Sequence, residues 1–361
     1  MNPIITVVAS VLVFGFLIFI HEFGHYITAR IFKITIQEFS IGMGPRLVSW
    51  VSKKTNIRYS IALLPIGGYV AMPGENGEFN DEGENTENDY SNDPNTFGKK
   101  PIYQRFIVTA AGAAVNIVAG FLALTILASV INFGGTKVGR FSDTTGTDIT
   151  VSSADSGLML GDEIIKIGGK RVVIYDELSY EIMRRGYEPI DILVRRNGEE
   201  ILLEDVVFPT ASEGGQLIGR MDFVPYAMEK NFGSIMKYSI RKGALTVRMV
   251  WESLYDLITG RYTFAAVSGP VGISGAIGDA VSYGMDAALH IFALISINLG
   301  VMNLLPFPAL DGGRLVTLLI EMITRKKLPA KVEGIINGVG LLILLAFSFI
   351  VMIKDVFQLI G

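Results

Sequence analysis

The chain has 361 residues, of which 50% are hydrophobic and 18% charged, and its mean hydropathy is +0.44. The charged fraction is well below the roughly 25% of soluble domains, so the composition predicts membrane spans. The net charge of −4 provides no general basic field, which argues against a nucleic-acid partner. The absence of cysteine excludes disulfides, thiolate nucleophiles and cysteine-ligated metals.

Uncharged stretches at residues 1–20, 106–136, 287–310 and 334–353 are each long enough to cross a hydrocarbon core about 30 Å thick. We therefore predict a polytopic α-helical membrane protein with four transmembrane helices. A signal peptide is the alternative for the first stretch, but a basic start is missing. Segment 262–278 is also uncharged, but Gly and Pro interrupt it, so we expect an interfacial or re-entrant piece there.

The distribution of Lys and Arg over the short connections predicts the orientation. Residues 26–105 carry nine and residues 305–333 carry five, whereas the N-terminal 20 residues carry none and the C-terminal tail carries one. We expect these two connections in the cytosol, with both termini and the long segment 137–285 outside. This architecture suits a bacterial inner (cytoplasmic) membrane.

The first connection combines a β-rich part with an acidic part. Residues 35–72 are rich in β-branched and aromatic residues between turn signals, which predicts three or four short strands. Residues 74–96 contain eight acids and six Asn but no Lys or Arg, which predicts a solvated, flexible loop.

Residues 137–208 are predicted to form a small extracytoplasmic αβ domain. The expected elements are strands Glu163–Ile167, Ile190–Arg195 and Ile201–Val206 and a helix at about Tyr175–Arg185. The run Gly157-Leu-x-x-Gly161-Asp162 resembles a PDZ domain of the bacterial protease type. PDZ domains bind extended peptides or chain ends by strand addition, although a packing module without a ligand is the alternative. Residues 209–285 then form an extracytoplasmic amphipathic or interfacial segment, with amphipathic helix over 229–259.

The end of the first span carries the motif His21-Glu22-Phe23-Gly24-His25. On a helix, the residues at positions i and i+4 share a face, so both imidazoles can bind one Zn²⁺. Glu22 is then placed to take a proton from a water at the metal. Two His and a Glu are costly at the end of an apolar span, which favours a functional role over a polar membrane boundary.

The third zinc ligand is predicted from depth in the membrane. The third span runs inward like the first, and its uncharged stretch ends at Asp311, so Asp311 and His21 should lie at similar depth. Pro306 and Pro308 precede Asp311 and should unwind the helix there. A catalytic zinc needs three protein ligands and an open position, which His21, His25 and Asp311 would satisfy. A capping Asp at the interface is the alternative.

Two further polar residues of the third span receive different interpretations. The amide of Asn303 could donate hydrogen bonds to a scissile carbonyl oxygen, with interhelical contact as the alternative. His290 begins this span at the opposite, outer face, so we expect it to be an interfacial residue and not a ligand.

The chain contains HEFGH (21–25), FSIGMGPRL (39–47), LLPIGGYVAMPGE (63–75), the PDZ-like run, SGPVGI (268–273) and NLGVMNLLPFPALDGGR (298–314) in this order. Together they resemble the site-2 protease family of intramembrane zinc metalloproteases, most closely its RseP/RasP branch. The resemblance covers nearly the whole chain. The chain differs from the proteobacterial members in having room for one PDZ domain, not two.

The resemblance implies roles for individual residues. His21, His25 and Asp311 match the zinc ligands, Glu22 matches the general base, and Asn303 matches the asparagine that helps to bind substrate or stabilise the intermediate. The strands within 35–72 match a membrane-associated β-sheet. The implied substrates are transmembrane helices of single-span membrane proteins, such as anti-sigma factors or signal-peptide remnants.

The predicted organisation follows from these assignments. Residues 1–136 hold the first two spans, 137–208 the PDZ-like domain, 209–285 the interfacial segment and 286–361 the last two spans. A polytopic zinc or ion transporter and an inactive substrate-binding scaffold are the alternative functions. The first would more often show inverted repeats, which are not visible, and the second would be expected to lack Glu22.

Two hypotheses concern how a substrate is bound. Because a helical peptide bond is shielded, it must be unwound before attack, and we expect Ile57–Leu64 to offer the unwound substrate an edge strand. The PDZ-like domain is expected to act outside the membrane as a gate or docking site that admits substrates whose outer portion has been trimmed.

Overall fold

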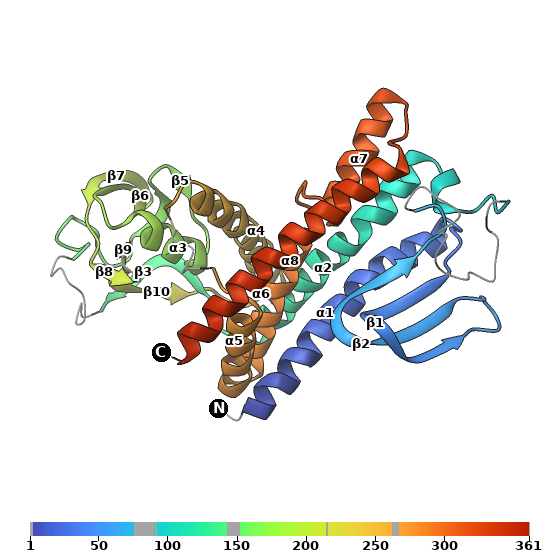
Figure 1. The fold of residues 1–361 in the computed structure, drawn as a ribbon. Helices are drawn as coiled ribbons and strands as arrows, with labels where there is room; N and C mark the ends of the chain where they lie inside the picture. The colour runs from blue at the N-terminus through green and yellow to red at the C-terminus, as the bar shows by residue number, and fades with distance from the viewer. Residues whose placement is uncertain are drawn as a thin grey trace. The chain divides into compact units, whose positions relative to one another are not determined.

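The computed structural model describes residues 3–75, 90, 92–142, 152–213, 216–261 and 267–360 (Figure 1). The chain divides into two compact units. Unit 1 contains Met1–Leu122 and Ser253–Gly361, and unit 2 contains Ala123–Glu252. Most of the predicted acidic loop lies outside the described residues.

The helices are α1 (Pro3–Ile31), α2 (Ile102–Val130), α3 (Tyr175–Arg185), α4 (Phe232–Ile258), α5 (Pro270–Tyr283), α6 (Met285–Asn303), α7 (Asp311–Thr324) and α8 (Ala330–Ile360), with a 3₁₀ turn at Phe97–Lys99. In the described part of the chain, four helices are long and apolar enough to cross a membrane: α1, α2, α6 and most of α8. The prediction of four spans is thus confirmed.

Two further helices lie in segments for which the sequence predicted no helix. The connection 305–333 contains α7, a two-faced helix whose polar positions include Arg314 and Glu321. The segment predicted as interfacial, 262–278, contains the start of α5. Pro270 occupies the first turn of α5, where proline is tolerated. Asp355 of α8 accepts hydrogen bonds at 2.9 Å from the N–H groups of Gly269 and Gly272, so a neighbouring helix caps α5.

The β-rich segment forms β1 (Glu38–Val51) and β2 (Arg58–Ala71), and each of these bends into two pieces. Residues 38–41 pair in parallel with 58–61 on one side and antiparallel with 68–71 on the other. Residues 46–51 pair antiparallel with 58–62. The bends coincide with Gly42, Gly44 and Gly67, whose positive φ angles favour glycine.

This register corrects one hypothesis. Residues 58–61 have partners on both sides, so Ile57–Leu64 is not an edge strand. Within the described sheet, the edges are instead 46–51 and 68–71. The segment packs on the end of α1 through a core that contains Ala29, Ile34, Ile36, Phe39, Ile57, Val70, Met72, Phe97 and Val108.

Unit 2 contains an antiparallel sheet in the order β10-β3-β4-β6-β7, with β5 beside β4. The strands are β3 (Gly134–Phe141), β4 (Glu163–Ile167), β5 (Lys170–Arg171), β6 (Ile190–Arg196), β7 (Glu199–Val206) and β10 (Phe223–Ala227). In a separate sheet, β8 (Thr210–Glu213) pairs antiparallel with β9 (Gln216–Gly219). In β6 the alternating residues Ile190, Ile192 and Val194 are buried, as the period of two of a strand requires. In β4 the buried residues are Ile164 and Ile167, because an irregularity between Ile164 and Lys166 shifts the register with β6. The predicted strands and helix of this domain are all present.

Charged side chains join α3 to the polar face of α4 within unit 2. Arg241 lies 2.7 Å from Glu177, and Arg248 lies 2.5 Å from Glu181. Lys242 pairs with Asp176. The predicted amphipathic helix at 229–259 is therefore present, and its basic residues bind the acidic face of α3.

Candidate metal centre

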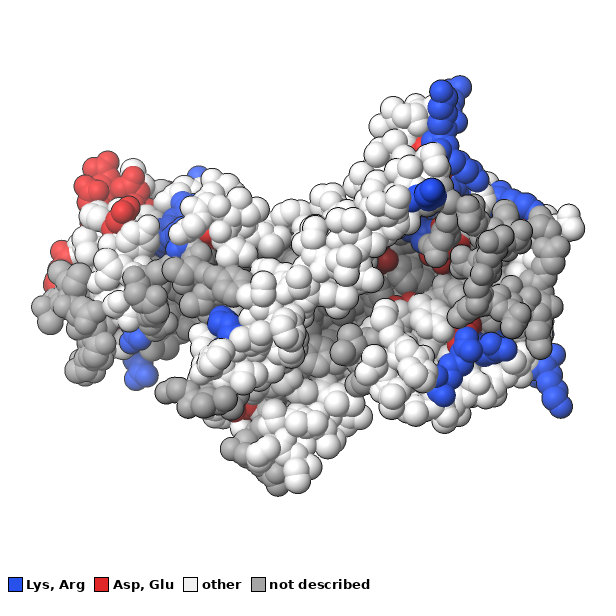
Figure 2. Space-filling model, in the orientation of Figure 1, with Lys and Arg blue, Asp and Glu red and all other residues white. Residues whose placement is uncertain are grey.

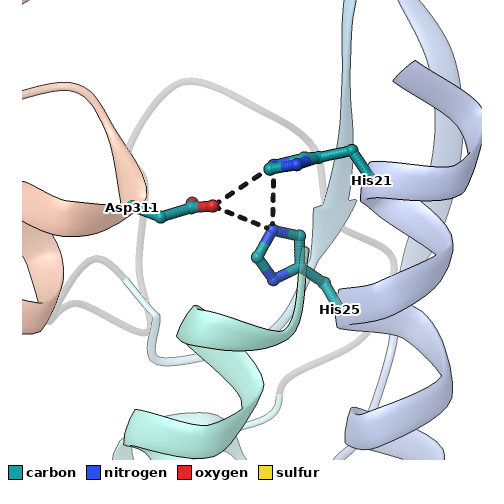
Figure 3. A group of neighbouring side chains, drawn as sticks. All are labelled: His21, His25 and Asp311. Carbon is teal, nitrogen blue, oxygen red and sulfur yellow. Dashed lines mark hydrogen bonds and ion pairs between the residues drawn. The ribbon is translucent and has the colours of Figure 1, made fainter. Parts of the chain in front are cut away.

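The motif residues His21, Glu22 and His25 lie on one side of α1. Each is only about 9% exposed, because α2 and the end of the β-rich segment cover this part of the helix. The i, i+4 spacing places both imidazoles on the same face of α1, as the sequence predicted. Figure 3 shows them pointing toward Asp311, which comes from a different helix.

A break between α6 and α7 positions the other two predicted residues. Asn303 is the last residue of α6 and Asp311 the first of α7, so the predicted unwinding is present. The break folds back tightly on α7: a Cβ atom at Gly312 would lie 2.0 Å from the Leu305 carbonyl oxygen, and one at Gly313 would lie 2.4 Å from that of Phe307. Only glycine fits these two positions, which gives the Asp-Gly-Gly sequence its structural reason.

Three ligand atoms converge between these helices. The Nε2 atoms of His21 and His25 are 3.3 Å apart, and Asp311 Oδ2 lies 3.2 Å and 3.4 Å from them. In a tetrahedral zinc site with bonds of about 2.0 Å, neighbouring ligand atoms are about 3.3 Å apart. The triangle therefore has the size of one face of such a site. The donor set of two imidazoles and a carboxylate fits a catalytic zinc with one open position.

Helix α2 contacts the Nδ1 atoms of both histidines, a feature that was not predicted from the sequence. The carbonyl oxygen of Val108 lies 2.8 Å from His25 Nδ1, and Asn116 Nδ2 lies 3.2 Å from His21 Nδ1. Between them, Gly112 faces the His25 ring. These residues recur at every fourth position and thus share one face of α2. The available signal was the spacing Gly112, Asn116 and Gly120 in an apolar span.

Glu22 faces a cavity beside the ligand triangle. The cavity is lined by His21, Glu22, His25, Gly68, Tyr69, Val70, Met72, Glu75, Thr109, Asp311 and Arg314. A Cβ atom at Gly68 would come 2.8 Å from Glu22 Cγ, so the strand edge at 68–71 passes directly beside this carboxylate. A carboxylate at this place can take a proton from a water in the cavity.

A second unpredicted feature borders the cavity. Arg314, one turn after Asp311, pairs with Glu75 at 2.7 Å and stacks over Phe97 with 4.9 Å between the guanidinium and the ring centre. These contacts tie the end of the β-rich segment to the start of α7.

The other predicted residues of α6 lie at different distances from the centre. Asn303 is half buried, and its Nδ2 is 3.5 Å from His21 Nδ1. His290 lies near the start of the same helix, about 20 Å from Asn303 by helical rise. In the described residues the metal-ligand cluster contains His21, His25 and Asp311, and His290 is not among them.

The model of peptidase family M50 matches residues 9–347, which is nearly the whole chain. The chain belongs to peptidase family M50. This M50 chain is 32% identical to a Clostridium acetobutylicum protein named as a candidate zinc metalloprotease, with 97% of each chain covered. It is 27% identical to the regulator of sigma-W protease RasP of Bacillus subtilis, over 98% of this chain and 99% of that one. It is 29% identical to the zinc metalloprotease RasP of Geobacillus kaustophilus, with 97% of each covered.

These similarities confirm the predicted family and activity class. The M50 chain is an intramembrane zinc metalloprotease of the site-2 type, and its cofactor is Zn²⁺. Its four apolar helices agree with a bacterial membrane protein. The transporter and inactive-scaffold alternatives are not favoured.

Proposed function

We propose that His21, His25 and Asp311 hold the zinc ion and that Glu22 is the general base of peptide-bond hydrolysis in membrane-embedded substrates. The observation that carries this proposal is the ligand triangle with edges of 3.2–3.4 Å, which has the dimensions of a tetrahedral site. Glu22 lies one residue from a ligand and faces the same cavity, so the proposed base and metal share one reaction space.

The chemistry follows from this arrangement. When bound, Zn²⁺ supplies a Lewis acid that polarises the scissile carbonyl and makes water acidic. Glu22 takes the proton of the attacking water and passes it to the leaving amine as the peptide bond breaks. Asn303 is half buried beside His21, and its amide can donate to the carbonyl oxygen as negative charge develops there.

The unwound substrate is proposed to bind along the strand edge at 68–71. Within the described sheet this edge has no further strand beyond it, and it lines the cavity through Gly68, Tyr69 and Val70. A substrate segment added here would run beside Glu22, because Gly68 and Glu22 line the same cavity and a Cβ atom at Gly68 would lie 2.8 Å from Glu22 Cγ. Main-chain hydrogen bonds of strand addition hold a peptide extended whatever its side chains.

The proposed substrates are transmembrane segments of single-span membrane proteins, of the anti-sigma factor or signal-peptide remnant kind. The name of the Bacillus subtilis relative, a regulator of a sigma factor, supports the first kind. We place the active site near the cytosolic side. Arg325, Lys326 and Lys327 follow α7, and Lys53 and Lys54 lie between β1 and β2. Figure 2 shows Lys and Arg side chains over this end of unit 1, as expected for a cytosolic end.

The αβ domain of unit 2 is proposed to be a PDZ-like gate outside the membrane. Its support is a five-residue edge strand, β10, which pairs with β3 on one side only in the described sheet. Such an edge can take up an extended peptide or chain end. We expect deletion of 137–208 to remove selectivity against full-length substrates; retained selectivity would contradict the gate.

The test of the proposed function is co-expression of a tagged single-span membrane protein with a shortened outer domain and either the wild-type chain or Glu22→Gln. We expect cleavage by the wild type alone. Zinc is then measured in both purified proteins, and equal zinc is expected. Cleavage by both proteins would contradict the role of Glu22, and a wild-type protein without zinc would contradict the ligand assignment.

A further inference from the structure

The two histidines of the proposed metal centre differ in the hydrogen-bond partners of their Nδ1 atoms. His25 Nδ1 lies 2.8 Å from the carbonyl oxygen of Val108. A carbonyl only accepts hydrogen bonds, so the proton of this imidazole sits on Nδ1 and the lone pair of Nε2 faces Asp311. His25 is therefore fixed by the backbone of α2 in the form that ligates a metal.

In the described structure, no backbone carbonyl faces Nδ1 of His21. The atoms that face His21 Nδ1 are two amide nitrogens, Nδ2 of Asn116 at 3.2 Å and Nδ2 of Asn303 at 3.5 Å. An N–H donor there pairs with an Nδ1 that lacks a proton. In a neutral ring the proton is then on Nε2, the atom that must bind the metal.

The side chain of Asn116 also contains an acceptor, Oδ1, which His21 Nδ1 needs if its Nε2 is to bind the metal. Asn116 is fully buried, and its Oδ1 has no hydrogen-bond partner among the described residues. A half turn about the Cβ–Cγ bond exchanges Oδ1 and Nδ2, which places an acceptor at His21 Nδ1. The backbone of Asn116 stays in place during this turn, because it lies in the interior of α2. Its carbonyl oxygen also accepts a hydrogen bond of 2.7 Å from the buried Ser296 of α6.

The two amides differ in what surrounds them. Asn116 lies in the middle of α2 and is inaccessible, whereas Asn303 ends α6 beside the break and is half buried. The buried amide can serve only His21, and the accessible one stays available to a substrate carbonyl.

We propose that Asn116 is the positioning residue for His21: its amide oxygen accepts the Nδ1–H, so that Nε2 presents its lone pair to zinc. This inference rests on the proposed function, since it presumes His21 as a ligand. A hydrogen-bond partner at the ring nitrogen that does not bind the metal orients the ring and strengthens it as a ligand, and its loss typically lowers metal affinity 10–100-fold.

The test measures zinc affinity by competition with a chelating dye, using the full-length chain in detergent. Asn116→Leu keeps the side-chain size but removes the acceptor, and we expect affinity to fall about 10–100-fold. Asn116→Asp presents an acceptor in either orientation, so we expect affinity at or above the wild-type value. The matched control is Ser296→Ala, which removes the hydrogen bond to the Asn116 backbone but leaves its amide, and should leave affinity unchanged.

Cobalt substitution provides a reading that packing alone would not change. The visible absorption of bound Co²⁺ reports ligand geometry, and it should be altered in Asn116→Leu and close to wild type in Asn116→Asp. If Asn116→Leu is not recovered folded, Asn116→Ala takes its place. Wild-type affinity in Leu, or an equal loss in Leu and Asp, would overturn the inference while the ligand assignment stands. A wild-type chain that binds no zinc would overturn both.

Discussion

Gly112 of α2 lies directly against the imidazole of His25: a Cβ atom added there would come 2.3 Å from Nε2. The same nitrogen is 3.4 Å from Asp311 Oδ2, at the proposed metal position. A spacing of 2.3 Å is far inside van der Waals contact, so the smallest possible side chain would have to move the ligand. The close approach of α2 and α1 is thus a requirement of the proposed metal centre as well as of packing.

The first prediction tests this contact. Gly112→Ala should displace the His25 ring and lower zinc affinity by at least tenfold, with a comparable loss of cleavage, as measured by chelator competition and by the tagged-substrate assay. Gly15→Ala is the matched control in a membrane helix, because nothing lies within 4 Å of its added Cβ atom. Its zinc affinity should equal that of the wild type. Unchanged affinity in Gly112→Ala would show that α2 can retreat without cost.

The second prediction separates binding from chemistry at Glu22. Glu22→Gln keeps size and hydrogen bonding but cannot take a proton, so cleavage should fall by about 10²–10⁴-fold. Zinc content, measured by atomic emission on the purified protein, should stay at the wild-type level. A variant that cleaves within tenfold of wild type would exclude Glu22 as the base.

The third prediction concerns the strand edge at 68–71. Successive N–H groups of a strand point in opposite directions, so either Tyr69→Pro or Val70→Pro removes an N–H that faces the cavity side. Of these two variants, the one that removes the N–H facing the cavity should lower cleavage at least tenfold while zinc content is retained. Ser49→Pro lies on the opposite edge of the sheet, 46–51, and serves as the control.

The outcome of this comparison decides between the two edges. Little loss in Ser49→Pro is expected, because proline is tolerated on edge strands and this edge is not proposed to bind the substrate. Equal losses at both edges would indicate general damage to the sheet and would contradict substrate addition at 68–71.

The fourth prediction concerns the pH dependence of unit 2. Burial alone would raise the pKa of Asp162, but hydrogen bonds from Arg196, at 2.8 Å to each carboxylate oxygen, and from the Met159 N–H hold the pKa below its usual value. A carboxyl whose pKa is lowered by folding stabilises the fold above its unfolded pKa of about 3.9. This contribution is lost as the pH falls through the lower folded value.

Asp162→Asn should therefore destabilise unit 2 by about 3 kcal/mol at neutral pH, since it leaves Arg196 without a buried counter-charge. The difference from wild type should shrink as the pH falls below about 4. Limited proteolysis of the full-length chain across a pH series measures both effects. Glu163→Gln, which breaks an exposed pair with Arg195, is the control and should cost less than about 1 kcal/mol. A pH-independent difference would contradict the assignment.

Local patterns in the sequence predicted much of the fold. The four spans follow from uninterrupted apolar length, and the strand Glu163–Ile167 and helix Tyr175–Arg185 have the predicted bounds. Periodicity and length are properties of one segment, so they are readable without knowing its neighbours. The same holds for His21, Glu22 and His25, whose common face is set by the helix repeat alone.

Only the tertiary structure decided which residues support the centre and which strand is free. Whether Gly112 and Asn116 face the histidines depends on how α2 is rotated and shifted against α1, and the apolar surface of a membrane helix does not reveal that rotation. Bends at glycines placed 58–61 in the middle of the sheet and 68–71 at its edge. The sequence by itself determined the four apolar spans and the shared face of the motif residues, because these depend on span length and helix repeat. Packing determined their surroundings, because contacts between distant segments exist only once the chain has folded.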